Sequence, residues 1–173
     1  MSFDAAAAEA DLLRATGIGG DHGARTRPDE DAGPALGGVP LSVVGIGWAT
    51  VELDRAATEL GSTAGYDVEP AEPDALLGAT ARIGRAAGSG PVAVLLEPFT
   101  EGRLAAFLAR HGEAPAVLYV VPPAGGLEAA VARLTAARIR TRSGSGPLGP
   151  AALVLGRSAD EPQLILVAVP SEP

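Results

Sequence analysis

Apolar and polar residues alternate along this chain with two different periods. Short runs rich in β-branched and aliphatic residues, such as LSVVGIGWATV over 41–51 and PVAVLLEP over 91–98, are typical of buried strands. Between them lie stretches such as LDRAATEL over 53–60, whose apolar residues recur at helical spacing. We therefore predict an α+β protein in which short strands alternate with amphipathic helices.

The predicted order of elements occurs twice. In residues 39–98 a strand is followed by a helix and then by two or three strands, and residues 113–173 repeat this order. Residues 99–112 form a short amphipathic hinge helix between the two copies. A unit that occurs only twice predicts two equivalent βαβββ modules related by a pseudo-twofold axis. With helices on one face of each sheet, the other faces would enclose a half-open barrel cleft.

The two copies also match position by position. Gly84-Arg85 recurs as Gly156-Arg157, 72 positions later (156 − 84). With the same offset, Gly45 in the first strand falls on Val117 in the fifth. This offset is the basis for every residue that we assign to the cleft.

Residues 1–38 differ from the rest and are predicted to be an N-terminal extension before a domain over 39–173. The Ala-rich segment 4–15 predicts a short helix that either docks on the domain or frays. Residues 17–38 are dense in Gly, Pro, Asp and Arg, so they bury too little apolar surface to offset their ordering entropy. We predict a flexible linker there.

Composition excludes several kinds of chemistry. The formal net charge of −8 argues against a nucleic-acid binder, which normally carries a basic surface. All 13 basic residues are Arg, and Lys and Cys are absent, which excludes a Schiff-base lysine, a P-loop lysine, a thiolate nucleophile and a zinc site built from cysteines. The absence of Lys and Asn, whose codons are AT-rich, suggests a GC-rich bacterial genome.

The chain has no run of the ~20 apolar residues that would span a bilayer, and its first residues do not resemble a signal peptide. We therefore expect a soluble, cytoplasmic protein without a membrane partner. The duplication is compatible with a monomer and with a homodimer, of which we favour the homodimer.

The duplicated unit resembles a known superfamily. The residues that carry the likeness are VGIGWATVELDRA in the first strand and helix, VAVLLEP in the closing strand, and HGE at the end of the hinge helix. In this combination the chain is similar to the vicinal oxygen chelate superfamily, which includes glyoxalase I, methylmalonyl-CoA epimerase, extradiol dioxygenases, and the fosfomycin- and bleomycin-resistance proteins. The resemblance covers about residues 41–170.

The resemblance implies a position for a metal site, but the residues there are not ligands. Metal-dependent members carry ligands in the first, fourth, fifth and eighth strands, where this chain has Gly45, Val94, Val117 and Leu166. None of the four side chains offers an imidazole, carboxylate or amide donor. Shifting the assigned positions by one residue does not supply a metal ligand either, since the neighbouring residues are Ala93, Ala116 and Ile165. We expect a metal-free member without a cofactor.

The same face gives the candidate binding site. The period of two in strands adds Gly47, Leu96 and Tyr119 to it, and Arg85 is predicted at its mouth. The predicted ligand-binding set is therefore Gly45, Gly47, Val94, Leu96, Val117, Tyr119, Leu166 and Arg85. Because this lining is largely apolar, it suits a hydrophobic or aromatic small molecule.

Several functions remain open at this point. The first is a metal-independent small-molecule binder, and the second is a metal-independent isomerase, cyclase or lyase of natural-product metabolism. In the second case Glu97 or Tyr119 would transfer a proton. Both residues also have structural interpretations, Glu97 as a helix cap or ion-pair partner and Tyr119 as a core residue. The third function is a regulatory or structural duplicate without chemistry.

Overall fold

A computed structural model describes residues 3–18, 35–122 and 126–168. The first module contains one helix and four strands of the main sheet, and a short helix follows it. These elements are β3 (Ser42–Ala49), α2 (Leu53–Ala64), β4 (Asp67–Asp74), β5 (Ala79–Arg85), β6 (Val92–Pro98) and α3 (Arg103–His111). The second module repeats the order with β7 (Ala114–Val121), α4 (Gly126–Ala136), β8 (Thr141–Gly146), β9 (Gly149–Val154) and β10 (Gln163–Val167). The prediction of two βαβββ modules is confirmed.

All eight strands form one curled sheet in the order β4-β5-β6-β3-β7-β10-β9-β8. The modules meet where β3 and β7 pair antiparallel at its centre. Gly45 lies opposite Tyr119 and Gly47 lies opposite Val117. Tyr119 is the repeat equivalent of Gly47, and Val117 is the repeat equivalent of Gly45, each 72 positions later. A twofold rotation therefore places the first pair on the second, as the repeat requires.

The repeat is one residue shorter at the closing strand. Gly47 pairs with Val94 in the first module, and its counterpart Tyr119 pairs with Ile165 in the second, so the offset there is 71 (165 − 94). The prediction that Leu166 faces the cleft is therefore wrong, because a shift of one residue turns a strand side chain to the other face. Ile165 takes that place.

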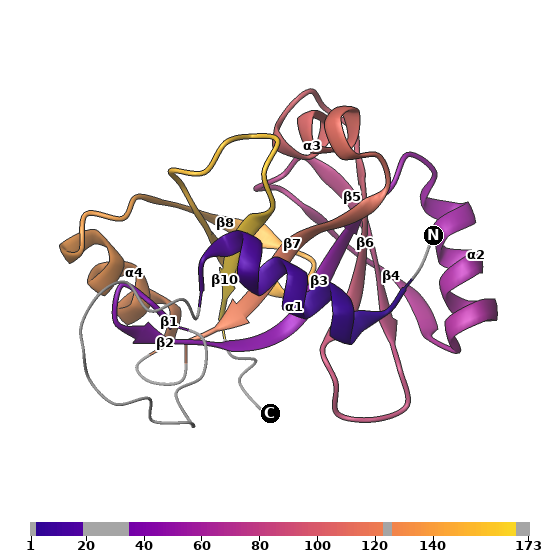
Figure 1. The fold of residues 1–173 in the computed structure, drawn as a ribbon, viewed down its shortest axis with the longest axis horizontal. Coiled ribbons are helices and arrows are strands. Elements are labelled where there is room, and N and C mark those ends of the chain that lie inside the picture. Colours follow the sequence, from indigo (N-terminus) through magenta and orange to yellow (C-terminus); the bar gives the residue numbers. More distant parts are fainter. Residues whose placement is uncertain (1–2, 19–34, 123–125, 169–173) are drawn as a thin grey trace.

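Helices α2 and α4 and the N-terminal helix cover one face of the sheet, and the other face carries a second core, to which α3 adds Leu104 and Phe107. Leu166 lies in the helix-covered core with Trp48 and Leu118, against residues of α2 and α4. The opposite core, on what we call the inner face, includes Val94, Tyr119 and Ile165. Figure 1 shows α2 and α4 at the two sides of the sheet and α1 (Ala5–Thr16) lying across β7 and β3 between them.

The N-terminal helix α1 docks rather than frays. Asp4 caps its start by accepting a hydrogen bond from the Ala7 amide at 3.0 Å, and Gly17 ends it in the left-handed conformation. Its residues Ala8 and Leu12 are buried in the helix-covered core. Part of the predicted linker, residues 19–34, lies outside the described residues. The rest includes β1 (Ala35–Leu36), which forms a small hairpin with β2 (Val39–Pro40) at the start of the domain.

Glu113 joins the two modules. Its carboxylate accepts hydrogen bonds from the Thr50 hydroxyl at 2.5 Å, the Val51 amide at 3.0 Å and the Arg55 guanidinium at 2.6 Å. These three groups belong to the turn after β3 and to α2, whereas Glu113 directly precedes β7. The hydroxyl of Thr50, followed by the Arg55 guanidinium and the Val51 amide, lowers the pKa of Glu113 to about 2, although partial burial opposes the shift.

We expect Glu113→Gln to lower the free energy of unfolding by roughly 1–3 kcal/mol at pH 7, since hydrogen bonds to a charged acceptor are lost or weakened. A carboxylate whose pKa is depressed on folding stabilises the fold above its unfolded pKa of 4.5, and this stability is lost as the pH falls toward 2. Urea unfolding at pH 7 and pH 2.5 measures both effects. Exposed Glu72→Gln is the control, and a Glu113→Gln deficit that does not shrink in acid would contradict the assignment.

Candidate functional site

The centre of the inner face is filled by side chains. Gly47 leaves room for the ring of Tyr119, since a Cβ on Gly47 would lie only 2.8 Å from the Cβ of Val117 and 3.2 Å from the Cε2 of Tyr119. At Gly45 a Cβ would lie 3.1 Å from the Cδ1 of Leu148. The two glycines therefore admit large neighbours, and no open cleft passes over them.

A buried carboxylate lies in the middle of this packing. Asp74 and Tyr119 are both fully buried, and the Tyr119 hydroxyl donates to Oδ2 of Asp74 at 2.8 Å. The other carboxylate oxygen, Oδ1, accepts from the amides of Leu76 and Leu77, each at 3.0 Å. Asp74 thus ties the turn between β4 and β5 to the central strand β7.

Burial controls the ionisation of the pair. Burial raises the pKa of Asp74 above its ordinary value, while the hydrogen bonds from Tyr119, Leu77 and Leu76 oppose that rise. Burial likewise raises the pKa of the Tyr119 hydroxyl well above its usual value, and the neighbouring carboxylate adds to the shift. Tyr119 is therefore a neutral hydrogen-bond donor at neutral pH.

Asp74 was missed by the sequence reasoning, which placed it in a loop or poor edge strand over 66–74. The residue ends strand β4 and begins the turn Asp74-Ala-Leu-Leu-Gly78. An Asp that starts a turn often accepts hydrogen bonds from the amides two and three residues later, and this is the signal that would have found it. Its partner Tyr119 is distant in sequence and carries no such signal.

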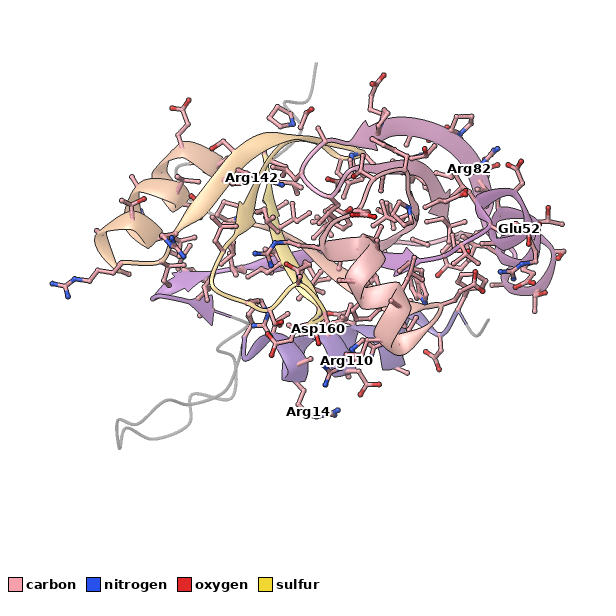
Figure 2. All side chains as sticks on the ribbon, turned by 90° about the horizontal axis from the view of Figure 1, so that it is seen from above. Arg14, Glu52, Arg82, Arg110, Arg142 and Asp160 are labelled. Carbon is pink, nitrogen blue, oxygen red and sulfur yellow. The ribbon has the colours of Figure 1, made fainter. Side chains whose placement is uncertain are left out.

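The same turn brings the two edges of the sheet together. The Ala75 amide donates to the Ser145 carbonyl at 3.1 Å, and the Arg142 guanidinium donates to the Leu76 carbonyl. Arg142 and Ser145 lie on β8, the edge strand of the second module, and Arg142 is labelled in Figure 2. Here the half-barrel is closed across its mouth, with Leu76 packed over Gly144.

An apolar cavity of about 360 Å³ opens at one end of the inner face, next to this closure. Its apolar wall is formed by Val44, Ile83, Val92, Val121, Pro147, Leu148, Val167 and Ala168. Arg85 at the end of β5 is the one charged residue on the wall among the described residues, and it pairs with Glu69 of β4. The volume lies within the range of small-molecule sites.

The predicted binding residues divide into three groups. Arg85 lines the cavity. Val94, Leu96, Val117 and Tyr119 lie on the inner face, as do the backbone positions Gly45 and Gly47, but none of the six lines the cavity. Leu166 lies on the opposite face.

Glu97, the predicted catalytic carboxylate, caps a helix. Its Oε2 accepts a hydrogen bond from the Leu53 amide at 3.0 Å, at the first turn of α2. The N-cap residue of that helix, Glu52, makes no side-chain cap of its own. Glu97 therefore satisfies an amide that the helix leaves unpaired, which stabilises the helix start.

The residues on the inner face do not fit a metal ion. In the described part of the chain, no three His, Cys, Asp or Glu side chains lie close enough together to hold one. Among the described residues, Asp74 is the buried carboxylate of the inner face, and it already accepts three hydrogen bonds. The close contacts at Gly47 also leave no room for a ligating side chain there.

The arrangement of strands is shared with solved structures. Methylmalonyl-CoA epimerase from Mycobacterium tuberculosis superposes with a TM-score of 0.64 over 75% of this chain and 88% of that chain, at 20% identity. The fold is the vicinal oxygen chelate fold. A Streptomyces coelicolor methylmalonyl-CoA epimerase variant in complex with 2-nitronate-propionyl-CoA gives a TM-score of 0.59 at 19% identity, over 76% of this chain and 98% of that one.

A hypothetical protein from Bacillus halodurans also matches, with a TM-score of 0.61 at 17% identity, over 77% of this chain and 96% of its own. No protein-family model and no curated protein matches the chain. At such low identities the likeness establishes the fold, and the ligands of those epimerases are properties of the epimerases. No helix in the described segments is long and apolar enough to cross a membrane.

Proposed function

We propose that the chain is a metal-independent small-molecule-binding protein whose ligand is largely hydrophobic and occupies the cavity at the end of the inner face. The observation that supports this function is the cavity itself, which is about 360 Å³ in volume and has eight apolar residues and one arginine on its wall. Metal independence is supported by the absence of a donor cluster in the described residues. A homodimer, a natural-product context and a GC-rich source stay predictions.

Proton transfer by Glu97 or Tyr119 has no support from the geometry. A general acid or base needs to reach its substrate within hydrogen-bond distance. The carboxylate of Glu97 is engaged at the start of α2, and the hydroxyl of Tyr119 is buried against Asp74. Neither residue lines the cavity, so binding is the function that the described residues favour.

The test is a substitution that fills the cavity with a larger side chain, and its readout is the binding of Nile red, an uncharged apolar dye. We expect Val121→Phe to weaken dye binding by about tenfold or more, a loss of about 1.4 kcal/mol, because the larger side chain takes up part of the cavity that Val121 lines. Val51→Phe is the matched control, since Val51 is 65% exposed and lies outside the cavity. Thermal unfolding confirms that both variants fold.

Metal independence is tested on the same sample. We expect substoichiometric metal in the purified protein by mass spectrometry and unchanged dye affinity after treatment with a chelator. A Val121→Phe variant that binds the dye as tightly as the wild type would refute the location of the site. A chelator that abolishes binding would refute metal independence.

A further inference from the structure

The apolar cavity has a counterpart at the other end of the sheet, and that counterpart is filled. Val44 and Val121 line the cavity, and the 72-residue repeat relates them to Ala116 and Ala49. Ala49 and Ala116 lie in one buried cluster with Leu104 and Phe107 of α3, and α3 contacts both β3 and β7. Figure 1 shows α3 at one end of the sheet.

In this counterpart the filling comes from helix α3. In the first module α3 follows the closing strand β6, and its apolar side chains Leu104 and Phe107 pack onto the inner face. The cavity is thus the pseudo-symmetric equivalent of a space that one leucine and one phenylalanine occupy.

Arg85 gives this cavity a charged group at a position where the other module has an apolar residue. Ile83 pairs with Val94 in the first module and Leu153 pairs with Ile165 in the second, so the offset in this strand is 70 (153 − 83). The counterpart of Arg85 is therefore Leu155, which packs against the inner-face core. Arg85 has an ion pair with Glu69, and the two side chains are 55% and 56% exposed. Exposed ion pairs contribute little stability, so a ligand can compete with Glu69 at low cost.

We propose that the ligand is a small organic carboxylate whose phenyl or branched aliphatic body fills the cavity and whose carboxylate binds Arg85. The body occupies the place that Leu104 and Phe107 occupy at the other end, and the guanidinium offers the paired donors that suit a carboxylate. The inference rests on the proposed function, because it assigns a ligand class to the same cavity. It adds an anionic group that the apolar wall alone does not require.

The experiment compares 4-phenylbutyrate with the uncharged 4-phenylbutyramide by calorimetric titration. We expect the wild type to bind the carboxylate about tenfold more tightly than the amide. Arg85→Gln should remove this preference, and Glu69→Gln should increase carboxylate affinity several-fold while leaving amide affinity unchanged. Arg82→Gln is the matched control, because Arg82 lies on the same strand, pairs with Asp54 and does not line the cavity. Figure 2 labels Arg82 near α2.

The outcomes separate this inference from the function on which it rests. Equal affinity for both probes in the wild type, or a carboxylate preference that survives Arg85→Gln, overturns the anionic ligand and leaves the binding function intact. A second outcome is that Val121→Phe abolishes Nile red binding but neither phenyl probe binds the wild type at millimolar concentration. This outcome also overturns the anionic ligand and leaves the binding function intact. If Val121→Phe leaves the affinities for the dye and both probes unchanged, the proposed function fails and the ligand class fails with it.

Discussion

Replacing Asp74 with alanine lowers the free energy of unfolding by about 3–5 kcal/mol, the largest effect that we expect from a substitution on the inner face. The change leaves the hydroxyl of Tyr119 and the amides of Leu76 and Leu77 without their acceptor, and the first of these groups is fully buried. A buried polar group that loses its partner costs about 1–3 kcal/mol. Urea unfolding at pH 7 measures the loss.

Asp74→Asn is the matched control for this prediction. The amide oxygen still accepts from Leu76 and Leu77, and the amide nitrogen donates to the Tyr119 oxygen, so the packing persists and only the Tyr119 O–H loses its acceptor. Because the hydrogen bonds to Leu76 and Leu77 remain and the buried charge is removed, we expect this variant to lose much less stability than the alanine variant at pH 7. An asparagine variant as unstable as the alanine variant would show that the carboxylate's charge, and not its hydrogen bonds, holds the turn.

The pH dependence of the free energy of unfolding distinguishes the effect of the Asp74 charge from the effect of its hydrogen bonds. Burial raises the pKa of Asp74 above 3.8, so the folded protein holds this proton more tightly than the unfolded chain. The associated stability is fully present below the unfolded pKa and is lost as the pH rises through the folded pKa. Relative to Asp74→Asn, the wild type therefore loses stability above pH 3.8. Glu113 acts in the opposite sense, since its pKa is lowered.

The sequence predicted the architecture because the two copies of the repeat can be recognised from the residues of their strands. The offset that relates Gly45 to Val117 gives the observed antiparallel pairing at the centre of the sheet. The same offset failed at Leu166, since the second copy is one residue shorter before β10. A single-residue deletion in a connection leaves no periodic trace, but it reverses the face of every residue in the following strand.

The interior of the site was less predictable than the fold. Strand periodicity placed Val94, Val117 and Tyr119 on the inner face, and the structure agrees. It gave no indication that the turn at Asp74 folds over that face and closes it, because this depends on a hydrogen bond between residues 45 positions apart. The cavity therefore lies at the end of the predicted cleft, and Arg85 is the predicted binding residue that lines it.

Replacing Leu12 with alanine lowers the free energy of unfolding by about 2–5 kcal/mol, because the N-terminal helix is part of the core. Leu12 is 2% exposed and packs in the same core as Trp48 and Leu118. Truncating a buried leucine loses its transfer free energy and leaves a cavity. The neighbouring Leu13 is only partly buried, so Leu13→Ala is the control and should cost less.

The single tryptophan distinguishes loss of the helix from loss of the fold. Trp48 is fully buried beneath α1, with the ring of Phe3 against it at 5.7 Å between centroids. If Leu12→Ala releases α1 alone, the emission of Trp48 shifts to the red before the sheet unfolds, and the two transitions separate in urea. If α1 is integral to the domain, fluorescence and circular dichroism report one transition at a lower midpoint. A variant with unchanged midpoint and emission would mean that residues 3–18 contribute no core, and the domain would then begin near Val39.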